Sequence, residues 1–289
     1  MFKGSYVAIV TPFKNGKIDE KKFAELVEFQ IKNGTDGIVP AGCTGEAATL
    51  NHEEQKNFIK LTCEIVDGRI SVIAGAGSNN TEEAISLTKF AEKAGCNGAL
   101  SITPYYNKPT PEGQYRHYEA IAGSVDIPIM LYNVPSRTGI CMTPETIARL
   151  SEIDNITAVK EASGSLDQVS QILALCDITV LSGDDSLTIP MMAIGATGVV
   201  SVVANIVPRE VRDMVFSFLN GDIEKAKKLH YKILALTKAM FIETNPIPVK
   251  TAMKIIGRGN GEFRLPLCEM AKQNEKKLEK ELKDFGLLK

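Results

Sequence analysis

Eight short apolar runs recur along this chain of 289 residues, and helical patterns separate most of them. Each run is rich in β-branched residues, is bounded by turn residues and is continuously apolar, which is typical of parallel strands covered on both faces. The runs occupy residues 6–10, 37–40, 71–74, 98–103, 127–132, 156–160, 178–181 and 198–203. Several helical segments also end on a glycine directly before the next run, which is a common helix stop. The pattern predicts an α/β chain in which strands and helices alternate.

Two parallel architectures fit this alternation, a closed barrel and an open doubly wound sheet. An open sheet that binds a dinucleotide carries a glycine-rich turn after its first strand, whereas here the first run leads into Thr11-Pro12-Phe13. The turn at residues 75–80, after the third run, lacks the third glycine of that motif. We therefore predict a (β/α)8 TIM barrel, a fold that commonly fills a chain of this length with a single core.

Only helical segments follow the eighth run, and they exceed the one helix that a barrel still needs. We predict that residues 1–220 form the catalytic barrel and that residues 221–289 form a C-terminal helical domain. The final segment, residues 272–283, is strongly charged, which indicates a solvated helix face and not a binding tail.

Charge and cysteine usage narrow the class of protein. The net charge of −2 and the pI near 6.0 provide no basic patch for a phosphate backbone, so we expect no nucleic acid partner. Residues 186–208 are uncharged, but Pro190, Gly195 and Gly198 divide them into core elements, so we expect no membrane span. The six cysteines form no C-x-x-C pair and the N-terminus has no long apolar signal region. Both features favour a reducing, cytoplasmic location.

In a barrel, the catalytic side chains lie at the carboxyl ends of the strands. Lys160 ends the sixth run, where burial of an amine is unfavourable unless the site uses it. A desolvated lysine loses its proton readily, and its free amine attacks carbonyl carbon. The alternative is a lysine that lies along apolar surface and keeps its amine in water. Tyr106, Tyr132 and Gly183 lie at the same rim as candidates for proton transfer or substrate contact, which favours the catalytic interpretation.

The turn after the second run is a candidate anion site. Gly42 and Gly45 flank Cys43 and Thr44, so backbone N–H groups can converge on a carboxylate, although a plain tight turn has the same pattern. Opposite a reactive lysine, this pocket would hold an α-keto acid. Arg137 offers a planar fork for a second carboxylate. The three histidines show no ligand spacing, so we expect neither a catalytic metal nor a cofactor.

Five motifs, in order over essentially the whole chain, resemble those of the dihydrodipicolinate synthase family, which belongs to the pyruvate-dependent class I aldolases. They are Gly42-x-x-Gly45-Glu46, Pro104-Tyr105-Tyr106-Asn107, Tyr132-Asn133-Val134-Pro135-Ser136-Arg137-Thr138-Gly139, Val159-Lys160-Glu161-Ala162 and Leu181-Ser182-Gly183-Asp184-Asp185. The first and fourth occur across the wider group of aldolases, whereas the long motif that begins at Tyr132 is much narrower.

The resemblance implies that Lys160 forms a Schiff base with pyruvate, whose enamine attacks L-aspartate 4-semialdehyde. The product would be 4-hydroxy-tetrahydrodipicolinate, which commits carbon to diaminopimelate and lysine. Two alternatives are a lyase for N-acetylneuraminate or a keto-deoxy sugar that uses the same imine, and a sensor that binds a keto acid without turnover. Arg137 favours a short charged aldehyde over a sugar, and a nucleophile argues against a sensor.

The resemblance also assigns roles to individual residues. Tyr132 would donate and accept protons, the Thr44 backbone would hold the pyruvate carboxylate, and the Val200 main chain would contact the keto acid. Arg137 would bind the carboxylate of the semialdehyde. Tyr106 would complete a proton relay from a neighbouring subunit, which implies a homo-oligomer, usually a tetramer built as a dimer of dimers.

Two departures from the family pattern stand out. Cys43 occupies the relay position that a threonine or serine hydroxyl normally holds, and a thiol is a weaker hydrogen-bond donor. Either the relay is less efficient or this chain is a variant of the family pattern. Ala47 and Gln55 replace a serine and a histidine of the lysine-inhibited enzymes, which leaves feedback inhibition open. The positions that match that pattern are His52, Asn79, Glu83 and Tyr105.

Overall fold

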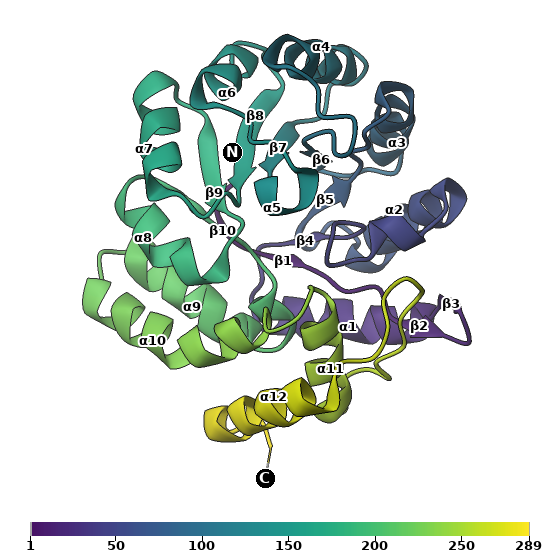
Figure 1. Ribbon diagram of the computed structural model, residues 1–289, viewed down its shortest axis with the longest axis vertical. Helices are drawn as coiled ribbons and strands as arrows, with labels where there is room; N and C mark the ends of the chain where they lie inside the picture. Colours follow the sequence, from purple (N-terminus) through teal and green to yellow (C-terminus); the bar gives the residue numbers. More distant parts are fainter. Residues whose placement is uncertain (1, 289) are drawn as a thin grey trace.

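The computed structural model describes residues 2–288 and contains a closed barrel of parallel strands (Figure 1). The strands pair in the order β1-β10-β9-β8-β7-β6-β5-β4, and β4 closes onto β1. Their bounds are β1 Gly4–Ala8, β4 Gly37–Val39, β5 Ser71–Gly75, β6 Gly98–Ile102, β7 Ile129–Asn133, β8 Ile156–Glu161, β9 Thr179–Ser182 and β10 Gly198–Ser201. All eight correspond to the apolar runs, so the predicted TIM barrel is confirmed.

Helices follow the strands and cover the outside of the barrel, except for the short helix α5, which lies over the barrel opening (Figure 1). They are α1 Glu20–Lys32, α2 His52–Val66, α3 Thr81–Lys93, α4 Pro111–Ala122, α5 Pro135–Thr138, α6 Pro144–Leu150, α7 Leu166–Leu175, α8 Thr188–Ala193 and α9 Pro208–Leu219, with the short 3-10 turns η1 Ala47–Thr49, η2 Asp185–Leu187 and η3 Val203–Asn205. The start of α2 is fixed by a capping box in which Asn51 and Glu54 bond each other's backbone N–H groups. Gly34, Gly95 and Gly195 follow helices at positive φ, as the stop signals predicted.

The core has two layers, one inside the ring of strands and one outside it. The inner layer fills the barrel and includes Tyr6, Ala158, Tyr132 and Val200, whereas the outer layer packs the barrel against the helices. Successive side chains of a strand point to opposite faces. Ala158 therefore lies inside the barrel and Val159 outside, which turns Lys160 inward.

Two short strands in the loop between β1 and α1 were not predicted. β2 Phe13–Lys14 and β3 Lys17–Ile18 form an antiparallel hairpin. Its turn residues Asn15 and Gly16 have φ of 53° and 74°, which is the backbone that an Asn-Gly turn adopts. Two-residue strands are too short to give the alternating pattern by which longer strands are found.

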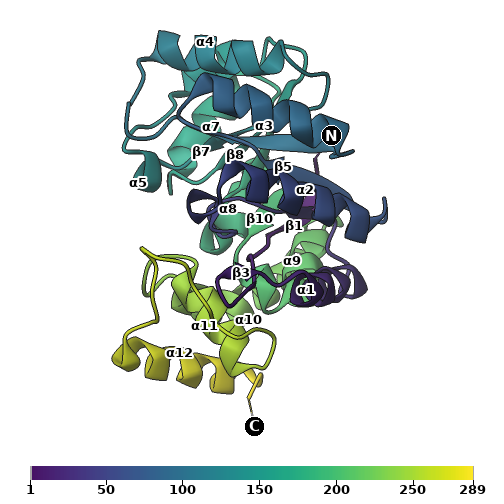
Figure 2. The same cartoon turned by 90° about the vertical axis from the view of Figure 1, so that its right-hand side faces the viewer.

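The C-terminal helices α10 Ile223–Ala239, α11 Ile247–Ile255 and α12 Lys272–Phe285 lie at one edge of the molecule (Figures 1 and 2). In both views α11 lies between α12 and the barrel. The division at residue 220 stays a prediction. The buried side chains of α12 are Leu278 and Leu282, and most of its charged residues are exposed. Among the helices formed by residues 2–288, none combines the length and apolar character needed to cross a membrane.

Candidate active site

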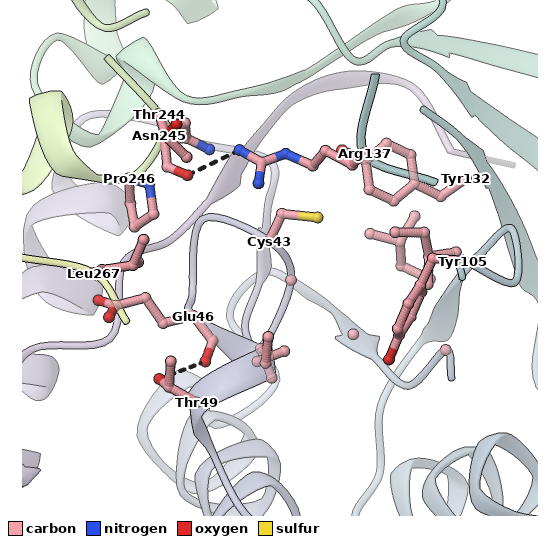
Figure 3. Close-up of a pocket in the computed structure, with 18 of the residues that line it drawn as sticks. Cys43, Glu46, Thr49, Tyr105, Tyr132, Arg137, Thr244, Asn245, Pro246 and Leu267 are labelled. Atoms are coloured by element: carbon pink, nitrogen blue, oxygen red, sulfur yellow. Dashed lines mark hydrogen bonds between the residues drawn. The ribbon is translucent and has the colours of Figure 1, made fainter. Parts of the chain in front are cut away.

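A cavity of about 380 Å³ opens at the carboxyl ends of the barrel strands. The loops after β4, β5, β6 and β7 contribute to its wall, and a segment between α10 and α12 closes one side. Figure 3 shows the Cys43 thiol pointing toward Tyr132, with the Arg137 side chain beside them. The structure thus brings together three of the residues that the sequence predicted for the site.

Lys160 lies on β8, directly behind Tyr132 of the cavity wall, and the pairing of the strands determines its neighbours. Lys160 is the direct partner of Tyr132 on β7 and of Leu181 on β9. Its Nζ lies 4.3 Å from the centre of the Tyr132 ring. Burial lowers the pKa of the Lys160 amine from 10.5 to about 8, although the nearby Cys43 and Asp185 act in the opposite direction. The alternative of a lysine with its amine in water is therefore wrong, because only 5% of the residue is exposed.

Gly183 makes room for the Lys160 side chain. A Cβ atom at Gly183 would lie 3.1 Å from both Cε and Cγ of Lys160 and 2.7 Å from the Cβ of Ala162. Contacts this close would displace the lysine. The absence of a side chain at Gly183 therefore leaves space for the Lys160 stem. The sequence did not indicate this contact between Gly183 and Lys160.

Tyr132 carries its phenol into a buried environment. Burial is the main cause that raises the pKa of Tyr132 well above its usual 10, and the neighbouring Cys43 adds to the rise. The phenol is therefore protonated across the physiological range, so it can donate a proton to a developing alkoxide. Cys43 is the polar group that adjoins it, where the family pattern has a hydroxyl.

The turn after β4 presents backbone groups to the cavity. Its own hydrogen bonds run from Glu46 N to Cys43 O, at 3.1 Å, and from Ala47 N to Gly42 O, at 3.2 Å. Among the described residues, the N–H groups of Cys43 and Thr44 have no protein acceptor, so they are available to an anion. The Thr44 hydroxyl accepts a hydrogen bond of 3.0 Å from Asn245 Nδ2, which fixes its oxygen and leaves its own proton to be donated.

Arg137 and Val200 lie on different sides of the barrel mouth. Arg137, in the short helix α5, lines the cavity and donates from Nη2 to the backbone oxygen of Asn245 at 2.8 Å (Figure 3). Val200 is completely buried on β10 and pairs with Tyr6 of β1. A contact of Val200 with a ligand through its main chain stays a prediction.

Tyr106 does not join the other candidates within one chain. The residue is 90% exposed, and its φ of 68° lies in the left-handed region. Tyr105, the residue before it, lines the cavity instead (Figure 3). The role of Tyr106 in a relay therefore depends on a second subunit and stays a prediction.

The C-terminal segment contributes cavity residues that no sequence motif predicted. Thr244, Asn245, Pro246, Pro266 and Leu267 all line the cavity. One sequence signal could have pointed to this segment, namely a lysine within an apolar helix. Lys250 stands in the sequence Ile247-Pro248-Val249-Lys250-Thr251-Ala252-Met253. A lysine in an apolar segment, there a strand, also identified Lys160.

The residues of the feedback pattern lie near one another beside the cavity. Nε2 of His52 is 3.6 Å from Oε2 of Glu83, and Asn79 donates to the backbone oxygen of Tyr105 at 3.1 Å. Gln55, which replaces a histidine, is buried and donates to the backbone oxygen of Gly75 at 2.8 Å. Its amide is thus already engaged by the barrel, and inhibition by lysine stays open.

Comparison with known proteins adds an independent line of support. The model of the dihydrodipicolinate synthetase family matches residues 1–285. The 4-hydroxy-tetrahydrodipicolinate synthases of Thermodesulfovibrio yellowstonii and Methanocaldococcus jannaschii are each 56% identical to this chain, with both chains covered in full. The dihydrodipicolinate synthase of Aquifex aeolicus has a crystal structure that superposes with a TM-score of 0.98 at 49% identity, over 99% of each chain. Another crystal structure of a dihydrodipicolinate synthase, 56% identical, also gives 0.98 and covers 99% of this chain and 100% of the other. The resemblance seen in the motifs is confirmed, and the chain belongs to the dihydrodipicolinate synthetase family.

Proposed function

We propose that the protein condenses pyruvate with L-aspartate 4-semialdehyde through a Schiff base on Lys160, and so makes 4-hydroxy-tetrahydrodipicolinate for lysine biosynthesis. The observation that carries this proposal is the buried Lys160 amine, with its pKa lowered to about 8, beside the phenol of Tyr132. Membership of the family over residues 1–285 supports the choice of substrates.

Chemistry begins with attack of the neutral Lys160 amine on the keto carbon of pyruvate. Tyr132 donates a proton to the departing oxygen, so that water leaves and an imine forms. Loss of a proton from the methyl carbon gives an enamine, which attacks the aldehyde carbon of the second substrate. The amine of that substrate then attacks the imine carbon, which closes the ring and releases Lys160.

In this proposal, two separate groups of donors bind the two substrate carboxylates. The free N–H groups of Cys43 and Thr44 hold the pyruvate carboxylate, and Val200 and Gly183 contact the bound keto acid. Arg137 binds the carboxylate of the semialdehyde, since its guanidinium lines the cavity.

The lyase for N-acetylneuraminate or a keto-deoxy sugar is the second candidate, and the cavity favours it less. Leu100, Ile102, Pro246 and Leu267 make much of the wall apolar, whereas a polyhydroxylated substrate needs a partner for each hydroxyl. A keto-acid sensor would have no use for a neutral amine aimed at a carbonyl.

The function is tested by borohydride reduction in the presence of pyruvate, followed by mass analysis of peptides. We expect one reduced pyruvate adduct, on Lys160, and none in Lys160→Arg. Absence of the adduct from the unmodified protein would exclude both aldolase functions. Pyruvate consumption with the semialdehyde and with candidate sugars then separates the two, since turnover with a sugar alone would refute the proposed substrate.

We also propose a cytoplasmic homo-oligomer, a dimer paired again into a tetramer, in which Tyr106 enters the partner's site. The support is its 90% exposed side chain at a strained φ of 68°. Two separately inactive variants, Lys160→Met and Tyr106→Phe, are unfolded, mixed and refolded together. We expect activity from about a quarter of the sites, because each hybrid dimer rebuilds one complete site. Activity no greater than that of the separate variants would refute the shared site.

A further inference from the structure

A buried ion pair joins the turn after β4 to the C-terminal helices. Nζ of Lys250, on α11, contacts Oε1 of Glu46. The two side chains are 4% and 0% exposed. The residues are 204 positions apart in the sequence, so the pair connects an early loop of the barrel to the end of the chain.

Aromatic rings enclose this ion pair. Lys250 Nζ lies 4.5 Å from the ring centre of Phe13 and 5.0 Å from that of Phe263, distances at which a cation is attracted to a ring. The second carboxylate oxygen of Glu46 is buried and has no hydrogen-bond partner among the described residues. Loss of Lys250 would therefore leave a buried carboxylate without its ion-pair partner, and Arg264 would be the cation that remains near it.

Glu46 belongs to the turn that presents N–H groups to the cavity. Its φ of 56° is left-handed, its N–H closes the turn onto Cys43, and its backbone oxygen accepts from Thr49 Oγ1 at 3.0 Å. Figure 3 shows the Glu46 carboxylate directed toward Leu267 and away from Cys43. Glu46 therefore acts on the turn and not on the reacting atoms.

Asn245 adds a second link from the same C-terminal segment. Its side chain donates to Thr44 Oγ1, and its backbone oxygen accepts from Arg137. Both predicted carboxylate sites are thus held by residues from the loop and helix at 244–250.

We propose that Glu46 and Lys250 are positioning residues that hold the turn at residues 42–45 in the geometry that binds the keto-acid carboxylate. This inference rests on the proposed function, because it assigns the turn to pyruvate. The binding of pyruvate then depends on α11, although α11 contributes no group to the chemistry at Lys160.

The competing explanation is that the pair contributes only to stability. Three variants separate the two explanations: Lys250→Met, Glu46→Gln and the double variant. Each is assayed for thermal unfolding and for the pyruvate concentration that gives half-maximal trapping on Lys160 by borohydride. Lys280→Met is the matched control, because it removes an exposed ion pair with Asp284 from α12.

We expect Lys250→Met to unfold at lower temperature and to need roughly 10- to 100-fold more pyruvate for half-maximal trapping. The maximal trapping rate should change much less, because Lys160 is untouched. The double variant should recover thermal stability, since no unpaired charge remains, but it should still need excess pyruvate because the link is lost. Lys280→Met should match the unmodified protein in both assays.

Recovery of both properties in the double variant would overturn the positioning role and leave a purely structural pair. Unchanged half-saturation in folded Lys250→Met would overturn it as well. If Lys250→Met does not fold, the pyruvate concentration for half-maximal trapping is compared in the double variant and in Glu46→Gln, and an unchanged value would again overturn the positioning role. Absence of any adduct from the unmodified protein would instead overturn the proposed function, and the positioning role with it.

Discussion

The lowered pKa of Lys160 gives a quantitative prediction for the pH dependence of imine formation. With a pKa of about 8, roughly a tenth of the amine is neutral at pH 7, which is about 300-fold more than at the ordinary value of 10.5. The neutral amine is the nucleophile. The rate of imine formation at low pyruvate concentration should therefore rise about tenfold per pH unit below 8 and level off above it.

The assay mixes the protein with pyruvate at a series of pH values, stops samples with borohydride at timed intervals and counts the adduct on Lys160 by mass. Thermal unfolding at each pH confirms that the protein is folded throughout. The Lys160→Arg protein sets the background, because a guanidinium stays protonated. A midpoint near 10 would refute the inference that burial activates the amine, and a flat profile would show that deprotonation does not limit the step.

Three further predictions concern single side chains. Cys43→Thr should raise turnover with little change in fold, because a hydroxyl is the stronger donor to Tyr132; an unchanged or lower initial rate would count against the relay. Gly183→Ala should reduce trapping on Lys160 at least tenfold, since the added Cβ meets the lysine stem, whereas Gly259→Ala, whose Cβ would lie 3.7 Å from Met253, should be neutral. Lys160→Met should raise the free energy of unfolding by up to roughly 3 kcal/mol at pH 7. The reason is that a lysine with a lowered pKa destabilises the fold fully below pH 8 and ceases to do so as the pH rises past 10.5. A stabilisation that persists above pH 11 in chemical unfolding would exclude that cause.

The barrel could be predicted because each strand signal is local. Continuous β-branched runs and the glycines after the helices lie within a few residues of the elements they define. Parallel strands place their carboxyl ends at one rim, so the order of the strands also predicted where the site lies. Lys160 was found in this way. The amine is buried because alternation along β8 turns it into the barrel, beside Ala158.

The rest of the site depends on contacts between distant segments, which no local pattern encodes. Thr44 and Asn245 are 201 residues apart in the sequence, so nothing near either residue indicates the other. Tyr106 is the opposite case: its position at the rim suggested a place in the cavity, but the residue is 90% exposed and Tyr105 lines the cavity instead. The hairpin at Asn15 and Gly16 did have a local signal, but its strands are too short to be recognised as strands.

The ion pair of Glu46 and Lys250 has a consequence for the order in which the protein becomes competent. The last barrel strand ends at Ser201, whereas Lys250 and the Phe263 ring that covers it come later. At about 5–20 residues per second on the ribosome, several seconds separate these points. A nascent chain can therefore contain every barrel strand and the Lys160 nucleophile while Glu46 still lacks its partner. Under the proposed positioning role, such a chain binds pyruvate poorly, and full affinity arrives only as synthesis ends.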